Sequence, residues 1–189
     1  MAAELSQAVI DECVGNAHGN LPRVRELVGL HPGLVNARAS WNESPIEAAA
    51  QMGNLPMIEF LIERGAPVDF FTACVLGRTD IVRLELASQP GRARDRGVHE
   101  LSSLYFAAIG GHPEVAELLL AAGAGVNDRS PAAAPIHGAV IGRSATMVRW
   151  LLDRGADQSL SDHEGRGARA LAEAMKYTDL VELFTLTAR

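Results

Sequence analysis

Few aromatic residues and an excess of acidic residues set the first limits on this sequence. Aromatic residues make up 5% of the 189 positions and hydrophobic residues 48%, so the core must be aliphatic and rich in alanine. Such a core suits small, closely stacked helices better than a β-sandwich, because strands favour aromatic and β-branched side chains. The net charge of −6 argues against a general nucleic-acid-binding role, because proteins of that kind carry a basic surface.

Cysteine residues and long hydrophobic runs are also scarce. Cys13 and Cys74 have no spacing typical of a metal or redox site, and we expect both to be buried thiols in a reducing compartment. Residues 1–16 include acidic residues and lack a long apolar segment, which argues against a signal peptide. The most apolar run, residues 118–125, is far too short to cross a bilayer. We therefore expect a cytoplasmic protein without a membrane partner.

Motifs of catalysis and cofactor binding are missing as well. The sequence has no P-loop, dinucleotide-binding fingerprint, zinc-ligand spacing or nucleophile elbow. His99 precedes Glu100 and His163 precedes Glu164, but two such neighbours do not define a metal site or an acid–base pair. We therefore expect no catalytic residues, no metal ion and no cofactor, and a protein that is not an enzyme.

The stretch from Ser102 to Ala124 predicts two short antiparallel helices. A serine at its start can cap the first helix, and Leu104 begins an apolar face with helical spacing. Gly111 ends this helix, because glycine adopts left-handed backbone angles without a steric penalty. Pro113 begins a leucine-rich second helix that Gly123 stops. Neither helix can bury its apolar face alone, so the pair needs neighbours.

This stretch resembles an ankyrin repeat of the stand-alone, bacterial type. The family motif has a T-P-L-H-x-A opening helix, a glycine break, a leucine-rich second helix and a terminal Gly-Ala. Residues 102–105 occupy the T-P-L-H position, and residues 44–47 and 135–137 fill it in other copies. Gly19 and Gly53 are separated by about one ankyrin period of roughly 33 residues. The resemblance implies an all-α solenoid of about six helix-turn-helix repeats.

The resemblance covers the whole chain as a single ankyrin-repeat domain, residues 1–189. The interval from Gly53 to Gly77 is shorter than one period, so the third repeat lacks the β-hairpin finger that normally precedes its first helix. Arg169 stands where the final repeat should have a buried leucine, so residues 178–184 are the weakest part of the match. The expected boundaries are an N-terminal cap repeat at 5–36, repeats at 37–69, 70–98, 99–128 and 129–158, and a C-terminal cap repeat at 159–189.

In ankyrin proteins the partner usually contacts the concave side, formed by the finger tips and the exposed ends of the first helices. By position, an apolar set occupies the solvent-facing slots at those helix ends, which favours a hydrophobic partner surface. Tight curvature or long fingers covering these residues is the alternative. The set is Met52, Val75, Leu76, Ile109, Ile141 and Met175.

Trp41 occupies the tip of the finger in repeat two, and Glu43 follows two residues later; we predict that both contact a partner. An exposed tryptophan can anchor a partner, because it buries a large area and keeps one hydrogen-bond donor. The alternative is that Trp41 folds back onto its own hairpin. His163 occupies the finger of the last repeat and joins the predicted contact residues.

The absent finger predicts a notch between Trp41 and the loop at residues 98–101. A notch with aromatic walls can hold a peptide side chain or a small apolar ligand. Closure of the gap by Phe70 and Phe71 is the alternative. The residues expected around the notch are Phe71, Val75, His99, Leu101 and Tyr105.

These observations predict an interaction scaffold that binds a protein or peptide in its concave groove. A small-molecule-binding or catalytic ankyrin variant using the notch near Trp41, Phe71 and Tyr105 is an alternative. A factor that masks one dedicated partner is another. Self-association is possible, because a second copy can cover an apolar groove, and no nucleic acid is expected as a partner.

Overall fold

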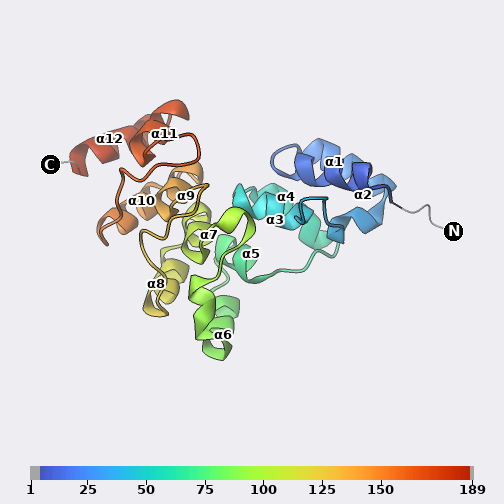
Figure 1. Cartoon of the computed structure of the whole chain (residues 1–189), viewed down its shortest axis with the longest axis horizontal. Helices are drawn as coiled ribbons and strands as arrows, with labels where there is room; N and C mark the ends of the chain where they lie inside the picture. Colours follow the sequence, from blue (N-terminus) through green and yellow to red (C-terminus); the bar gives the residue numbers. More distant parts are fainter. Residues whose placement is uncertain (1–4, 188–189) are drawn as a thin grey trace. The chain divides into compact units, whose positions relative to one another are not determined.

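The computed structural model describes residues 5–187, which form helices joined by turns and loops (Figure 1). Twelve α-helices and three short 3₁₀-helices lie in this range, and it contains no named β-strand. The all-α fold is therefore confirmed. The α-helices are α1 (Gln7–Ala17), α2 (Leu21–Leu30), α3 (Pro45–Gln51), α4 (Leu55–Glu63), α5 (Phe70–Val75), α6 (Thr79–Ser88), α7 (Ser103–Gly110), α8 (Pro113–Ala121), α9 (Pro135–Ile141), α10 (Ala145–Leu152), α11 (Ala168–Ala174) and α12 (Thr178–Thr187), and the 3₁₀-helices are η1 (Pro32–Asn36), η2 (Pro90–Arg94) and η3 (Val98–Glu100).

The chain divides into two compact units, residues 1–72 (unit 1) and residues 73–189 (unit 2). The division falls inside α5, the shortest α-helix, in the repeat that lacks its finger. Residues 64–69 alone connect α4 to α5, whereas residues 89–102 connect α6 to α7 and hold both η2 and η3. The predicted loss of the finger before the third repeat is therefore confirmed.

Unit 1 contains two helix pairs, α1 with α2 and α3 with α4. The helices of each pair contact each other, and α1 also packs against α3. The same sequence, Gly-Asn-Leu-Pro, begins the second helix of both pairs. Asn20 accepts the N–H of Arg23 at 3.3 Å, and Asn54 accepts that of Met57 at 3.3 Å. Each asparagine satisfies a backbone donor that the helix start leaves without a partner.

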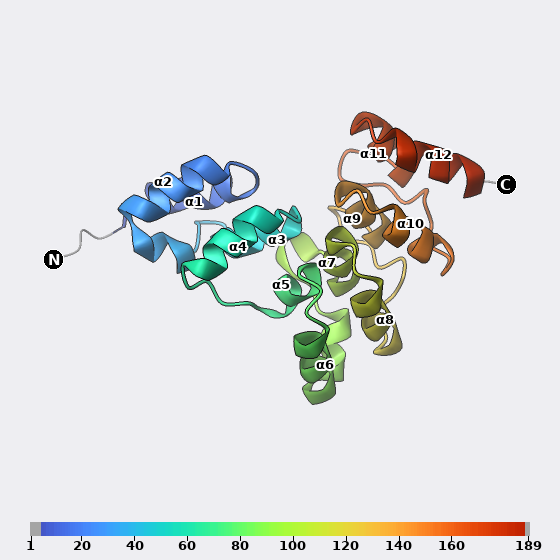
Figure 2. The same cartoon turned by 180° about the vertical axis from the view of Figure 1, so that it is seen from behind.

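Unit 2 shows the expected serial stacking. Among its first helices, α7 packs against α9 and α9 against α11; among its second helices, α6 contacts α8, α8 contacts α10 and α10 contacts α12. The last pair, α11 and α12, lies side by side in both views (Figures 1 and 2). The second helix predicted at residues 178–184 is thus confirmed, with Leu180 and Phe184 buried. Arg169 is exposed and forms an ion pair with Glu173 at 3.0 Å. The helix α11 therefore turns a charged side chain to solvent where a buried leucine was expected.

Glycines allow the first helices of unit 2 to approach closely. A Cβ atom at Gly138 would lie 2.9 Å from the carbonyl oxygen of Tyr105 on α7. A Cβ atom at Gly142 would overlap the carbonyl oxygen of Ile109, and one at Gly110 would overlap that of Val75. Only glycine fits these three contacts without movement of the backbone.

Both cysteines lie in the interior of the helical stack. Cys13 and Cys74 are free and buried, as predicted. Burial raises the pKa of the Cys13 thiol to about 11, so this side chain behaves as a small apolar group. Within residues 5–187, every helix is too short or too polar to span a membrane.

Candidate partner-binding surfaces

A tight, cross-linked turn presents Trp41. In the Trp41 finger (residues 37–44), the N–H of Ala39 donates to the carbonyl of Glu43 at 2.8 Å. Asn42 adopts a left-handed conformation, φ 64°, which asparagine tolerates better than most residues. Arg38 donates to the Asn42 side chain at 2.8 Å and bridges to a carboxylate oxygen of Glu47 at 3.0 Å. These bonds fix the finger before any partner is present.

Trp41 is 49% exposed, yet its indole is held in place. Its Nε1–H donates to Oε2 of Glu43 at 2.7 Å. The sequence left open whether Trp41 faces a partner or folds back onto its own hairpin, and each alternative describes part of the residue. The N–H bonds back to its own finger, and much of the ring faces solvent. A partner can contact the ring without competing for the donor.

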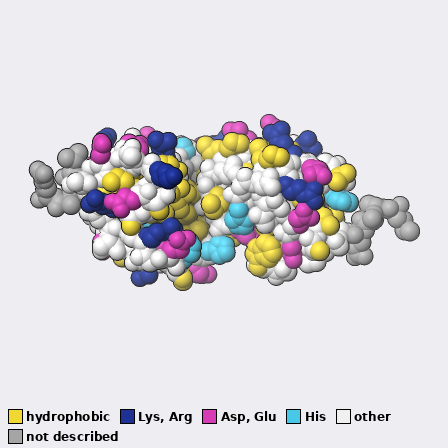
Figure 3. All heavy atoms as spheres, turned by 90° about the horizontal axis from the view of Figure 1, so that it is seen from above, with side chains coloured by type: hydrophobic (Ala, Val, Ile, Leu, Met, Phe, Trp, Pro, Cys, Tyr) yellow, Lys and Arg dark blue, Asp and Glu magenta, His cyan; other side chains and the backbone are white. Residues whose placement is uncertain are grey.

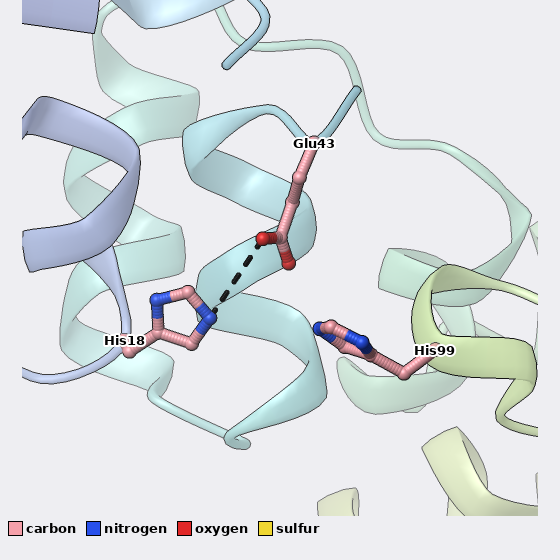
Figure 4. A group of neighbouring side chains, drawn as sticks. All are labelled: His18, Glu43 and His99. Carbon is pink, nitrogen blue, oxygen red and sulfur yellow. Dashed lines mark ion pairs between the residues drawn. The ribbon is translucent and has the colours of Figure 1, made fainter. Parts of the chain in front are cut away.

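Glu43 is only 2% exposed and sits among polar side chains from α1 and α3. Oε1 accepts from Nε2 of Gln51 at 2.9 Å, and Nε2 of His18 lies 3.8 Å from Oε2 (Figure 4). Nε2 of His18 also lies 2.6 Å from Nε2 of Gln51. Glu43 was predicted to contact a partner; in the structure, its carboxylate is buried and supports Trp41.

Sequence reasoning missed His18 as part of this cluster. His18 lies one repeat before Met52, at the same position after the end of a first helix. Including the N-terminal cap repeat among the predicted solvent-facing helix ends would have identified it. Met52 is 44% exposed, as predicted for a solvent-facing slot. Gln51 is 6% exposed, and its amide group donates to the buried carboxylate of Glu43.

Asp11 on α1 holds the other side of the Trp41 finger. Its Oδ1 accepts the backbone N–H of Ser40 at 2.7 Å and the Gln7 side chain at 2.8 Å. The hydrogen bonds from Gln7 and Ser40 lower the pKa of Asp11, so its carboxylate stays charged at neutral pH. We call the set of His18, Trp41 and Met52, with the supporting Asp11, Glu43 and Gln51, the Trp41 surface.

The predicted stripe along the first-helix ends is not uniformly exposed. Val75 and Ile109 are buried, at 0% and 3% exposure, so their assignment to solvent-facing slots was wrong. Gly110 and Gly142 are the reason, because each lets the next helix approach the carbonyl at that helix end. Leu76, Ile141 and Met175 are half-buried and stay as the accessible members in unit 2.

The residues predicted around the notch differ in exposure. Phe71 in unit 1 is half-buried. In unit 2, Leu101 and Tyr105 are buried, at 3% and 4%, and burial raises the pKa of Tyr105 above its ordinary range. His99 is exposed and has a left-handed backbone conformation, φ 54°. The notch draws on residues of both units and stays a prediction.

The exposed histidine of the last finger, His163, lies at 3.6 Å from Glu164. Its backbone N–H donates to the carbonyl of Ala132 at 2.9 Å and so connects two successive fingers. The buried His137 has a structural role: its Nδ1 accepts from the Ala134 N–H at 3.1 Å, and its Nε2 lies 3.1 Å from the Arg166 carbonyl. These contacts leave His137 no role at an exposed surface.

Most arginines already serve internal contacts. Arg94 donates to the Gly123 carbonyl at 3.0 Å, and Arg96 to the carbonyls of Glu100 and Arg129 at 2.9 and 3.2 Å. Figure 3 shows basic and acidic side chains lying beside each other at several places on the face in view. Arg92 also forms an ion pair with Glu85 at 3.3 Å, so the three arginines at 92, 94 and 96 all contact other parts of this chain.

One depression lies at the C-terminal helix pair, between α11 and α12. Its volume is about 430 Å³, and Glu173, Lys176, Thr178, Val181 and Glu182 line it. Its side chains combine both charge signs with one aliphatic residue, and no constellation for catalysis is present among them.

Comparison with known protein families accounts for the architecture. A family model described as ankyrin repeats (3 copies) matches residues 70–162, and an ankyrin repeat model matches residues 41–73. The curated proteins include no significant match to the chain. The matched segments, together with the serial stacking of helix pairs in unit 2, show that the chain belongs to the ankyrin-repeat proteins.

Proposed function

We propose that this chain is an interaction scaffold that binds a protein or peptide through the Trp41 surface. Ankyrin repeats are generally protein–protein interaction modules and are typically non-enzymatic. The observation that carries the proposal is the combination at Trp41 of a half-exposed ring and a fixed orientation. Tryptophan is among the residues most enriched at binding hot spots.

Pre-organisation of Trp41 supports a binding role. The bond to Glu43 and the cross-linked finger restrict the indole before association. Immobilising a flexible side chain on binding costs about 0.5–1.5 kcal/mol, and a fixed ring avoids much of that cost. Met52 adds a second exposed apolar group from the end of α3, and the aliphatic and thioether parts of such a residue adapt to different partners.

Unit 2 supplies the further contacts of the proposal. Five of the predicted partner contacts in this unit are half-buried or exposed, and we keep them as proposed contacts. None of them offers a pre-oriented aromatic ring, so we do not propose them as anchors. They are Leu76, His99, Ile141, His163 and Met175.

The test is affinity capture from the native cell with wild-type chain and the Trp41→Ala variant. We expect Trp41→Ala to lose most of the partner, with an affinity decrease of about tenfold or more for a hot-spot tryptophan. Leu30→Ala is the matched control, because Leu30 is 67% exposed in the same unit and lies outside the Trp41 surface. Partner recovery that Trp41→Ala leaves unchanged would exclude this surface.

A charge placed at Ile109 is unsuitable for this test. Ile109 is 3% exposed and contacts α9 through Gly142, so Ile109→Asp would bury an unpaired carboxylate and disrupt folding. Met52→Asp instead places a charge at an exposed apolar position of the Trp41 surface, and it should weaken partner binding without loss of the fold.

A further inference from the structure

Three aromatic side chains of this protein, Phe60, Trp150 and Tyr177, are covered by arginines. In each case the guanidinium carbon lies within cation–π range of the ring centroid. The pairs are Arg25 with Phe60 at 5.1 Å, Arg64 with Phe60 at 5.1 Å, Arg143 with Tyr177 at 4.9 Å and Arg154 with Trp150 at 3.9 Å.

Trp41 lacks such a cover. Among residues 5–187, no lysine or arginine lies over its ring, although Trp41 is more exposed than the half-buried Trp150 and Tyr177. Its N–H donates to a carboxylate, and a negative acceptor at that position pushes electron density into the indole. A more electron-rich ring attracts a cation more strongly, because cation–π attraction depends on the negative face of the ring.

The carboxylates beside Trp41 also lack basic partners. Asp11 accepts from the residue before Trp41, and Glu43 accepts from Trp41 itself. In the described part of the chain, neither forms an ion pair with a lysine or arginine, and Nε2 of His18 lies 3.8 Å from the Glu43 carboxylate. By contrast, the Glu47 carboxylate pairs with Arg38 within the same finger, at 3.0 Å.

These features combine into one acidic site without a lysine or arginine partner, beside an exposed aromatic ring. A buried charge is normally paired, and Glu43 has neutral donors from Trp41 and Gln51 where a cation would be expected. The Trp41 side chain bonds one of these carboxylates directly, and the backbone of the preceding residue bonds the other, so a cation over the ring would be attracted by both charges. Attraction between charges grows as solvent is excluded, so the site favours a positive partner group.

We propose that the partner presents an arginine side chain, within a basic segment, that stacks on the ring of Trp41 and is attracted by the charges of Asp11 and Glu43. A guanidinium fits this position because it is planar, weakly hydrated and able to stack on aromatic faces. Arg154 on Trp150 is an example of the same contact inside this chain. The inference rests on the proposed function, since it names the chemistry of the partner at the Trp41 surface.

The test is a selection of random peptides displayed on phage, with wild-type chain as bait and Trp41→Ala as the counter-selection. We expect the Trp41-dependent peptides to be enriched in arginine. Replacement of the key arginine by citrulline, its uncharged isostere, should weaken binding about fivefold or more, at about pH 8 where histidine charge has little influence.

The outcomes separate the two proposals. Trp41-dependent peptides without basic residues, or peptides that tolerate citrulline, would overturn the arginine inference and leave the binding surface intact. Failure to recover any Trp41-dependent peptide would overturn both. Arginine-rich peptides that bind wild type and Trp41→Ala equally would reflect the general negative charge alone and would also overturn the inference.

Variants of the carboxylates sharpen the test. Glu43→Gln and Asp11→Asn should each lower affinity for the arginine peptide about twofold to fivefold, with less effect on the citrulline peptide. Glu59→Gln is the matched control, because it removes one exposed carboxylate of α4 outside the Trp41 surface and should leave binding unchanged. Trp41→Phe should retain more affinity than Trp41→Ala, since it keeps an aromatic face.

Binding can be followed at Trp41 alone. The chain contains only two tryptophans, Trp41 and Trp150, so a Trp150→Phe background leaves Trp41 as the single indole emitter. Quenching of its emission by the arginine peptide and not by the citrulline peptide would support a direct stack. Equal quenching by both peptides would contradict it.

Discussion

The opening positions of α3 in unit 1 and α9 in unit 2 solve the same problem with different residues. At α3, a carboxylate oxygen of Glu47 accepts the Ser44 N–H at 2.8 Å and its hydroxyl at 2.9 Å. At α9, Nδ1 of His137 accepts the Ala134 N–H at 3.1 Å. Both side chains satisfy a backbone donor at the helix start, but the histidine has a second ring nitrogen available.

The next finger decides what that second nitrogen can do. Nε2 of His137 lies 3.1 Å from the carbonyl of Arg166, in the finger of the following repeat. After α4 the finger is missing, because residues 64–69 lead directly into α5. Glu47 bonds Arg38 in its own finger, at 3.0 Å. His137 thus connects its repeat to the next finger, whereas Glu47 bonds within its own finger.

The residues at the contacts between first helices also differ between the units. In unit 2, α9 meets α7 through Gly138 and Gly142, where a Cβ atom would collide with the backbone. In unit 1, α3 packs against α1 with Ala48, Ala49 and Ala50 buried and no glycine within α3. Unit 2 thus has positions where one methyl group is prohibitive, and the following variants probe this difference.

Gly142→Ala should have the largest effect. Its Cβ would overlap the carbonyl oxygen of Ile109, so α7 and α9 must separate, at a cost of about 3 kcal/mol or more in the free energy of unfolding. Urea unfolding followed by Trp150 emission in a Trp41→Phe background reports on unit 2. Gly91→Ala is the control within the same unit, because Gly91 has open space around it and should change stability by less than about 0.5 kcal/mol.

His137→Ala should follow in size. Loss of the ring leaves the Ala134 N–H and the Arg166 carbonyl without this partner and creates a cavity, at a cost of about 2–3 kcal/mol. The same urea experiment measures it. The exposed His163 is the control, since His163→Ala should change stability by less than about 0.5 kcal/mol. Equal effects of the two variants would contradict a structural role for His137.

Glu47→Ala should cost less, about 1–2 kcal/mol, because it removes one side of a capping box in a half-buried site. Trp41 emission in a Trp150→Phe background reports unfolding of unit 1. Glu47→Gln should recover most of the loss, since an amide oxygen can still accept the Ser44 N–H. A larger loss for Glu47→Ala than for His137→Ala would break the comparison between the units.

Acid should weaken unit 2 through His137 by a smaller amount. Burial lowers the pKa of His137 from its ordinary 6.5, against opposing effects of the Arg166 hydrogen bond and the charge of Asp162. The unfolded chain therefore binds this proton more readily, so the contribution is present above about pH 6.5 and is lost as pH falls through the folded pKa. Unfolding at about pH 7.5 and about pH 5.5 should show less acid loss for His137→Gln than for wild type.

Local sequence rules accounted for much of the fold. Ser102 caps α7 by accepting the Tyr105 N–H at 3.2 Å, Gly111 is left-handed at φ 76°, and Pro113 begins α8. The missing finger before α5 followed from the shortened interval to Gly77. These features depend on residues close together in the chain, where capping and backbone preference act.

The sequence predicted only part of the candidate surface. Trp41 and Met52 were identified from their slots, because repeat position alone predicts exposure when no neighbour intrudes. Val75 and Ile109 were misassigned, since their burial depends on glycines in the next helix. The contact between His18 and Gln51 joins residues from successive repeats and required the stacked structure to be seen.

The sequence by itself determined the repeated helix pairs, their caps and the place where one finger is lost, because each follows from short-range spacing and backbone geometry. The tertiary structure decided which helix ends are buried and which carboxylates lack a cation. Those properties depend on how closely neighbouring backbones approach and on which side chains meet after stacking. Both are relations between residues of different repeats, and a local sequence pattern does not encode them.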